Sequence, residues 1–201
     1  MSIVIRPMAS ADVGEVTRVH VTAFPKFFLT FLGPAFLRQL YGGILDDRGG
    51  IAFVAEHDGR IVGFVAGTDT PSRFYSTLLR RRFIRFGLAS ALPLLRRPSI
   101  LRRLLRAFGK AADAPGAQSG RAELMSLAVL PMQQGGGSGR RLVSAFVDEV
   151  RARGGKAVFL TTDREENESV NHFYSRTLGF ALVRQFTTRE GRAMNEYELT
   201  L

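Results

Sequence analysis

The strongest constraint on the fold of this sequence is a glycine-rich turn that joins an apolar run to the start of a helix. Residues 127–130 are apolar, Pro131 ends the run, and four of the five residues from Gly135 to Gly139 are glycine. A backbone with so few side chains can turn several N–H groups inward, at the positive end of the following helix dipole. The stretch therefore predicts a strand, a turn and a helix that together bind a phosphate group.

Two common phosphate-binding motifs do not fit this turn. A P-loop requires Lys and then Ser or Thr after its last glycine, where this chain has Arg140 and Arg141. The dinucleotide-binding motif, Gly-x-Gly-x-x-Gly, would place its third glycine on Arg140 when counted from Gly135, and on Leu142 when counted from Gly137. The glycines therefore indicate a different kind of phosphate site, and a plain strand-to-helix turn is the alternative.

The turn resembles the acyl-CoA-binding motif of the GNAT acetyltransferase superfamily, Gln/Arg-x-x-Gly-x-Gly/Ala. Gln134, Gly137 and Gly139 match its defined positions. The resemblance covers nearly the whole chain except a segment of about residues 70–118. It implies an acetyltransferase that uses acetyl-CoA as cosubstrate, with no metal.

A second segment resembles the same family. Asn167 is followed seven residues later by Tyr174, and Gly179 with Phe180 closes the predicted helix. Four residues separate Tyr174 from Gly179, where the common family pattern has three. The additional residue predicts a longer or bulged helix end.

The resemblance assigns the acetyl-CoA site to two parts of the chain. In this family the pantetheine arm bonds to the backbone of the strand before the turn, and the pyrophosphate lies on the N–H groups of the turn. The implied binding residues are Leu127, Ala128, Val129, Gln134, Gly135, Gly136, Gly137, Ser138, Gly139 and Arg140. Asn167 is implied to hold the pantetheine or adenine side of CoA, with helix N-capping as the alternative role.

Two catalytic side chains follow from the same resemblance. Tyr174 matches the general acid that protonates the departing thiolate, because a phenol with a pKa of about 10 carries its proton at neutral pH. The alternative is a half-buried tyrosine that closes a helix on the sheet. Glu123 stands where some members carry the glutamate that accepts the proton of the amine, and a solvated strand end is its alternative. His172 is expected at the surface.

Hydrophobic periodicity predicts the other elements of a mixed α/β fold. The predicted strands are 3–5, 51–56, 61–66, 123–130, 157–162, 180–186 and 194–201. The predicted helices are one that follows its N-cap Ser10 and runs to about Ala23, and those at 24–41, 139–153 and 167–178. This order matches the GNAT fold, in which the two central strands splay apart. In this chain a helical insert is predicted between the third and fourth strands. At 201 residues the chain is expected to form a single domain, 1–201.

The positive charge is concentrated in that insert. The chain carries a net charge of +10, and residues 70–112 hold ten arginines, Lys110 and no acid, a local charge of +11. Residues 100–110 separate apolar and basic side chains onto two helical faces. A lid packed on its own domain is favoured over docking on an anionic membrane or on an acidic protein such as acyl carrier protein. Nucleic acid is not expected, because polar base-reading residues are not interleaved with the arginines.

Composition excludes some chemistry and some locations. The chain has no cysteine, which excludes disulfides, thiolate metal sites and an acyl-cysteine step. Its longest apolar runs contain Pro34 and Pro93 and fall short of the roughly 18 residues of a membrane span, so a cytoplasmic protein without a transmembrane segment is expected.

Together these features predict an N-acetyltransferase that acetylates a primary amine by direct attack in a ternary complex. The expected acceptor is a small molecule, with an amino sugar or another anionic compound favoured by the basic insert. The phenylalanines between Phe24 and Phe36 are expected in the core, with a wall of the acceptor pocket as the alternative. A non-catalytic acyl-CoA-binding module is the alternative function, and a homodimer is one possible assembly.

Overall fold

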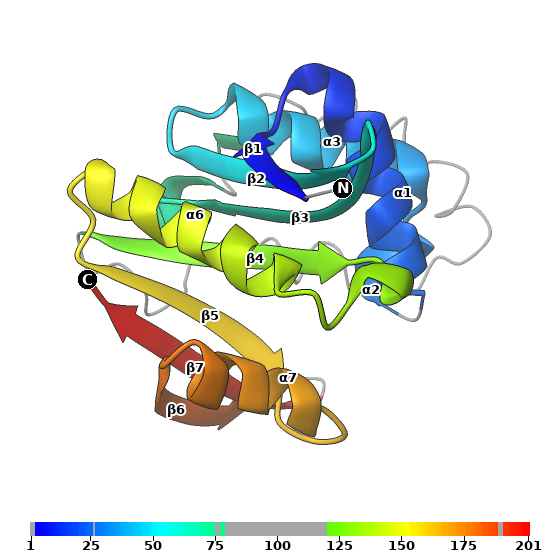
Figure 1. Ribbon diagram of the computed structural model, residues 1–201. Helices are drawn as coiled ribbons and strands as arrows, with labels where there is room; N and C mark the ends of the chain where they lie inside the picture. Colours follow the sequence, from blue (N-terminus) through cyan, green and yellow to red (C-terminus); the bar gives the residue numbers. More distant parts are fainter. Residues whose placement is uncertain (1–2, 26, 75–76, 79–119, 189–190) are drawn as a thin grey trace.

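The computed structural model describes residues 3–25, 27–74, 77–78, 120–188 and 191–201 (Figure 1). Most of the predicted basic insert, about residues 70–118, lies outside this part of the chain. Within the described residues seven strands form one mixed sheet in the order β1-β2-β3-β4-β5-β7-β6, and β4 with β5 is its only parallel pair.

The elements follow the predicted order. The strands are β1 (Val4–Pro7), β2 (Gly50–His57), β3 (Arg60–Thr68), β4 (Arg121–Val129), β5 (Ala157–Asp163), β6 (Ala181–Thr187) and β7 (Ala193–Thr200). The α-helices are α1 (Val13–Ala23), α2 (Phe28–Phe31), α3 (Pro34–Asp46), α6 (Ser138–Ala152) and α7 (Glu168–His172). Short 3₁₀ turns, η1 (Ser10–Asp12) and η2 (Pro131–Gln133), precede α1 and follow β4, and α7 continues into the π-helical turn η3 (Phe173–Thr177). Among the described helices, none combines the length and apolarity needed to cross a bilayer.

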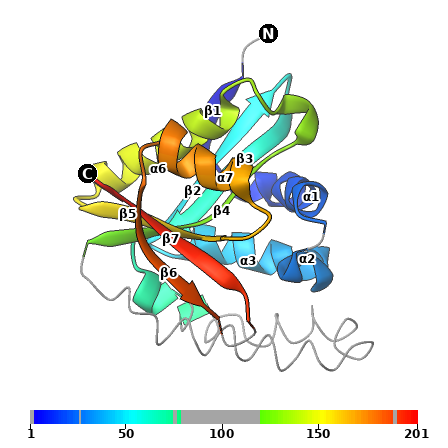
Figure 2. The ribbon, with the colours of Figure 1, turned by 90° about the horizontal axis from the view of Figure 1, so that it is seen from below.

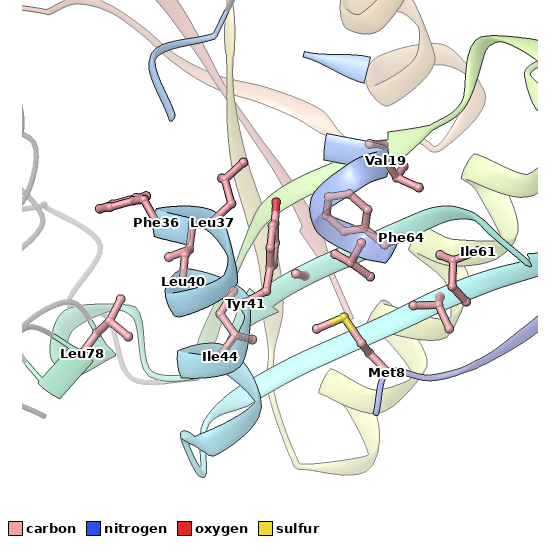
Figure 3. Packing of buried hydrophobic residues seen from close by; sticks show 14 of the residues in the cluster. Met8, Val19, Phe36, Leu37, Leu40, Tyr41, Ile44, Ile61, Phe64 and Leu78 are labelled. Atoms are coloured by element: carbon pink, nitrogen blue, oxygen red, sulfur yellow. The ribbon is translucent and has the colours of Figure 1, made fainter. Parts of the chain in front are cut away.

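Helices cover both faces of the sheet and bury two hydrophobic clusters. Helices α1 and α3 pack on one face, where Val19, Phe36 and Phe64 lie in the first cluster (Figure 3). Phe74 and Leu78, near the start of the predicted insert, are buried in the same cluster. Helix α6 packs on the opposite face and contributes its apolar side to the second cluster. Figure 2 shows α6 and α3 on opposite sides of the strands.

Two predicted details of the first helices are wrong. The predicted helix 24–41 is interrupted at Gly33, which has a φ of 88°, and α3 begins at Pro34. The proline lacks an N–H and disfavours helical backbone at the residue before it, so the two helices cannot be continuous. Ser10 does not cap α1, because it lies inside the turn η1, where the Asp12 carboxylate accepts the Ala9 N–H at 2.8 Å.

Strand β4 carries a bulge in its pairing with β3. Its register against β3 shifts between Leu124 and Ser126, so one additional residue is inserted there. The Ser126 side chain forms a hydrogen bond with the hydroxyl of Tyr41, which lies 2.5 Å from Nδ1 of His20. Burial lowers the pKa of His20 to about 4, so its imidazole is neutral at pH 7. A chain of three polar side chains, two of them buried, therefore ties α1 and α3 to the bulge.

Candidate active site

The two central strands separate after a short paired segment. Strands β4 and β5 pair only from Arg121 opposite Ala157 to Glu123 opposite Phe159. Beyond these residues β4 continues to Val129, and Figure 1 shows β5 diverging from it. The second half of β4 therefore presents an edge that β5 does not cover.

The backbone groups of this edge face the gap. Leu130 donates its N–H to the carbonyl of Val62 on β3 at 2.8 Å. Because hydrogen-bonded and non-hydrogen-bonded residues alternate in an antiparallel pair, the backbone groups of Leu127 and Val129 point away from β3. The carbonyl of Val129 accepts a hydrogen bond from Nε2 of Gln134 at 3.1 Å. Ala128 instead packs its side chain into the first hydrophobic cluster.

The glycine-rich turn leads from this edge to an uncapped helix. Gly135 and Gly137 have φ values of 85° and 76°, in the left-handed region that favours glycine. Gly137 is the N-cap of α6, and no side chain caps the helix there. The first N–H groups of a helix have no intrahelical acceptors. The start of α6 therefore offers a set of free N–H donors, which the positive end of the helix dipole makes favourable for an anion.

The space around the turn is suited to a bound phosphate. A Cβ atom added at Gly135 or Gly137 would meet no atom within 4 Å. Gly136 and Arg140 are exposed, whereas Ser138 is buried and its Oγ has no hydrogen-bond partner among the described residues. A Cβ atom at Gly139 would lie 3.4 Å from the Phe173 ring. The turn thus combines open space on one side with close packing on the other.

Tyr174 lies in the π-helical turn η3, which confirms the predicted bulge at this helix end. The N–H of Leu178 reaches back five residues to the carbonyl of Phe173, which accommodates the additional residue before Gly179. Only 6% of Tyr174 is exposed, and its ring stacks on Tyr197 with centroids 6.5 Å apart. Burial raises the pKa of Tyr174, so the phenol is protonated at neutral pH.

Asn167 and its neighbours fasten the end of β5 to α7. Asn167 occupies the N-cap position of α7, but its Nδ2 donates to the carbonyl of Asp163 at 3.1 Å and does not cap the helix. The alternative of capping by the Asn167 side chain is therefore wrong. Asn171 donates to the same carbonyl and accepts a hydrogen bond from the Thr162 hydroxyl at 2.7 Å. His172 is exposed, as predicted.

Glu123 lies where β4 and β5 begin to separate. Its side chain is partly buried, which does not agree with a solvated strand end. Burial raises the pKa of Glu123 to about 7, and the charge of Glu196 adds to this effect. Such a carboxyl group is about half ionised near pH 7, where it can accept a proton.

Sequence reasoning missed the charged side chains beside Glu123. Arg121 forms ion pairs with Glu196 and Glu198, and Arg184 pairs with Glu196. The available signal was the spacing of Glu196 and Glu198 in the last strand, because residues two apart in a strand share a face and two neighbouring carboxylates favour a cationic partner. In the described part of the chain, no three His, Asp or Glu side chains are grouped as a metal site.

The predicted aromatic run divides between the core and the surface. Phe36 is fully buried in the first cluster, as expected. Phe27 and Phe31, in contrast, are 49% and 52% exposed. Core packing therefore accounts for only part of this run.

Comparison with solved structures shows the same fold. The ribosomal-protein-alanine N-acetyltransferase of Brucella melitensis superposes with a TM-score of 0.64 at 16% identity, covering 98% of this chain and 99% of that chain. YncA of Salmonella typhimurium, solved with its cofactor acetyl-CoA, gives a TM-score of 0.63 at 16% identity, with 100% and 94% coverage. The PaiA N-acetyltransferase of Thermoplasma acidophilum, in complex with coenzyme A, gives a TM-score of 0.59 at 14% identity, covering 99% of this chain and 100% of that chain.

Sequence comparison gives the family. No curated protein matches the chain significantly. The family model described as the acetyltransferase (GNAT) family matches residues 15–180, which is most of the sequence. The mixed sheet and the separated central strands, which the resemblance implied, are both present, and the chain belongs to the GNAT family of acetyltransferases.

Proposed function

We propose that this protein transfers an acetyl group from acetyl-CoA to a primary amine by direct attack within a ternary complex. One observation carries the proposal: the uncovered edge of β4 leads directly to the uncapped, glycine-rich start of α6. The long polar arm of an acyl-CoA donor matches the edge of β4, and its pyrophosphate matches the start of α6. When bound, acetyl-CoA supplies a thioester that is activated for attack by an amine.

The proposed binding residues divide by the part of acetyl-CoA that they contact. Backbone groups of Leu127 and Val129 hold the pantetheine arm, whereas those of Ala128 between them face β3, and Gln134 lies at the end of this edge. The N–H groups of Gly135 through Arg140 hold the pyrophosphate at the positive end of α6. Asn167 is proposed on the CoA side of α7, where its own amide is bonded to the carbonyl of Asp163.

Glu123 and Tyr174 are proposed to move the two protons of the reaction. Glu123 accepts a proton from the amine, which must be neutral to attack, and its pKa of about 7 suits that task. Tyr174 donates its phenolic proton to the departing thiolate, and the raised pKa keeps that proton in place beforehand. The backbone N–H of Leu127 faces the same gap and can stabilise the negative charge that develops on the thioester oxygen.

The chain is proposed to form a single domain spanning 1–201. The acceptor is proposed to be a small-molecule amine. A preference for an anionic acceptor rests on the charge of residues 70–112, most of which lie outside the described residues. The same segment is the proposed contact for a membrane surface or an acidic protein.

Replacing Gly137 with valine tests the cofactor site. We expect Gly137→Val to weaken CoA binding by at least about tenfold in calorimetry, because a branched side chain disfavours the left-handed turn and enters the open space beside it. Gly154→Val is a matched control at the other end of α6. Gly154 has a φ of 78° and equally open surroundings, so its replacement strains the backbone similarly, far from the turn. Equal CoA affinity in the two folded variants would contradict the assignment.

A further inference from the structure

Five side chains around Glu123 share one face of the sheet. Glu123 is opposite Phe159 on β5, and Phe159 is opposite Glu198 on β7. Partners across strands and residues two apart along a strand point to the same face. Arg121, Glu123, Phe159, Glu196 and Glu198 therefore lie on one side, opposite the face covered by α6. Arg184 on β6 joins them, because it is directly opposite Glu196.

Glu196 is held by two arginines. Its Oε1 accepts from Nη2 of Arg121 at 3.1 Å, and its Oε2 accepts from Nε and Nη2 of Arg184 at 3.1 and 2.7 Å. Nη2 of Arg121 also lies 2.5 Å from Oε2 of Glu198, and its guanidinium stacks 4.5 Å above the Phe159 ring. The carboxylate of Glu196 thus has a fixed position between two cations.

Glu123 has no cationic partner among the described residues, although Arg121 is two residues away on the same face. Of the other charged groups on this face, Asp163 is paired with Arg192 at 2.7 Å. Helix α1 also packs against β4. Its Glu15 and Arg18 lie 3.7 Å apart, and its His20 contacts Tyr41. Arg121 is therefore the cation best placed to pair with Glu123, and both Glu196 and Glu198 bind it.

We propose that Glu196 is a positioning residue for proton transfer: it pairs with Arg121, two residues from Glu123 on the same strand, and balances the charge of Arg184, so that Glu123 stays unpaired and able to accept the proton of the amine. A carboxylate beside a free guanidinium would be a much weaker base, because an opposite charge favours its ionised form. The negative charge of Glu196 also contributes directly to the raised pKa of Glu123. This inference rests on the proposed role of Glu123 as the base.

The pH dependence of kcat/KM tests the inference with three variants. In the wild type we expect the acidic side of the profile to have its midpoint near pH 7, the pKa of Glu123. Glu196→Gln should move that midpoint down by about one pH unit or more, since the negative charge of Glu196 is lost and Arg184 is left without its partner, while Arg121 keeps its pair with Glu198. The KM for acetyl-CoA should not change. Glu198→Gln is the matched control: it lies on the same strand and face and also binds Arg121, but leaves both contacts of Glu196 intact, so its midpoint should stay near that of the wild type.

Each outcome separates the role of Glu196 from that of Glu123. If Glu196→Gln keeps the wild-type midpoint while Glu123→Gln abolishes the acidic side of the profile, Glu123 is the base and the role of Glu196 is refuted. If Glu123→Gln retains the wild-type profile, the base is another group and both assignments are wrong. A ¹³C NMR titration of the Glu123 carboxyl, which needs no turnover, should show a lower pKa in folded Glu196→Gln. An unchanged pKa there would overturn the inference.

Discussion

Replacing Tyr174 with phenylalanine should lower kcat by about 10²- to 10⁴-fold, the range typical of a lost general acid. The phenyl ring keeps the packing against Phe180 and Tyr197, so the protein should fold and bind acetyl-CoA with unchanged affinity. Only the proton for the departing thiolate is lost. Single-turnover rates with saturating acetyl-CoA, measured beside CoA calorimetry, separate the chemical step from binding.

Tyr197 provides the matched control for this experiment. It is a second buried tyrosine, stacked on Tyr174, and its hydroxyl contacts Asn195 at 3.4 Å. Tyr197→Phe removes a hydroxyl from the same cluster without touching the proposed acid, so kcat should stay close to that of the wild type. Equal losses in both variants would point to packing, and a wild-type rate in Tyr174→Phe would show that the thiolate leaves without its help.

Replacing Glu123 with glutamine should reduce the rate most strongly below the pKa of the acceptor amine. In that range the amine arrives protonated and needs the base, whereas at higher pH it is already neutral and the loss should shrink. We expect a loss of about 10²-fold or more at pH 7 to 8. Initial rates of amine acetylation across pH 6 to 10 give the profile.

The same variant should be more stable than the wild type at alkaline pH. The pKa of Glu123 is about 7 in the folded protein against an ordinary value of 4.5. A raised carboxyl pKa contributes stability that is fully present below pH 4.5 and is lost as the pH rises through 7. Glutamine carries no such cost, so Glu123→Gln should gain up to about 3 kcal/mol at pH 8 and almost nothing at pH 4. Urea unfolding at both pH values measures this. A destabilised variant whose rate loss is independent of pH would show that Glu123 is structural.

Local features of this fold could be predicted from the sequence. The two-residue turn of the β2–β3 hairpin has positive φ at Asp58 and Gly59, and the Asp-Gly pair indicates it directly. The uncapped start of α6 follows from the glycines around Gly137 in the same way. The π-helical turn at Tyr174 was predictable because a single additional residue before Gly179 must be accommodated within a few positions.

Features that depend on strand order could not be predicted in this way. Arg121 and Glu196 are 75 residues apart and meet only because β7 inserts between β5 and β6. Their contact, and with it the environment of Glu123, has no counterpart in local spacing. The break at Gly33 was local, but the apolar residues on both sides of it outweighed Pro34 in the prediction of one long helix.

The most direct test of the proposed function is the stoichiometry of acetyl transfer. Purified protein with acetyl-CoA and a panel of primary amines is assayed for released CoA thiol and, by mass spectrometry, for the N-acetylated amine. We predict that thiol release requires an amine and equals the acetylated product. Varying both substrates should give intersecting double-reciprocal lines, as expected for a ternary complex. Saturable acetyl-CoA binding with no amine-dependent thiol release across the panel would contradict the account and indicate a non-catalytic acyl-CoA-binding module.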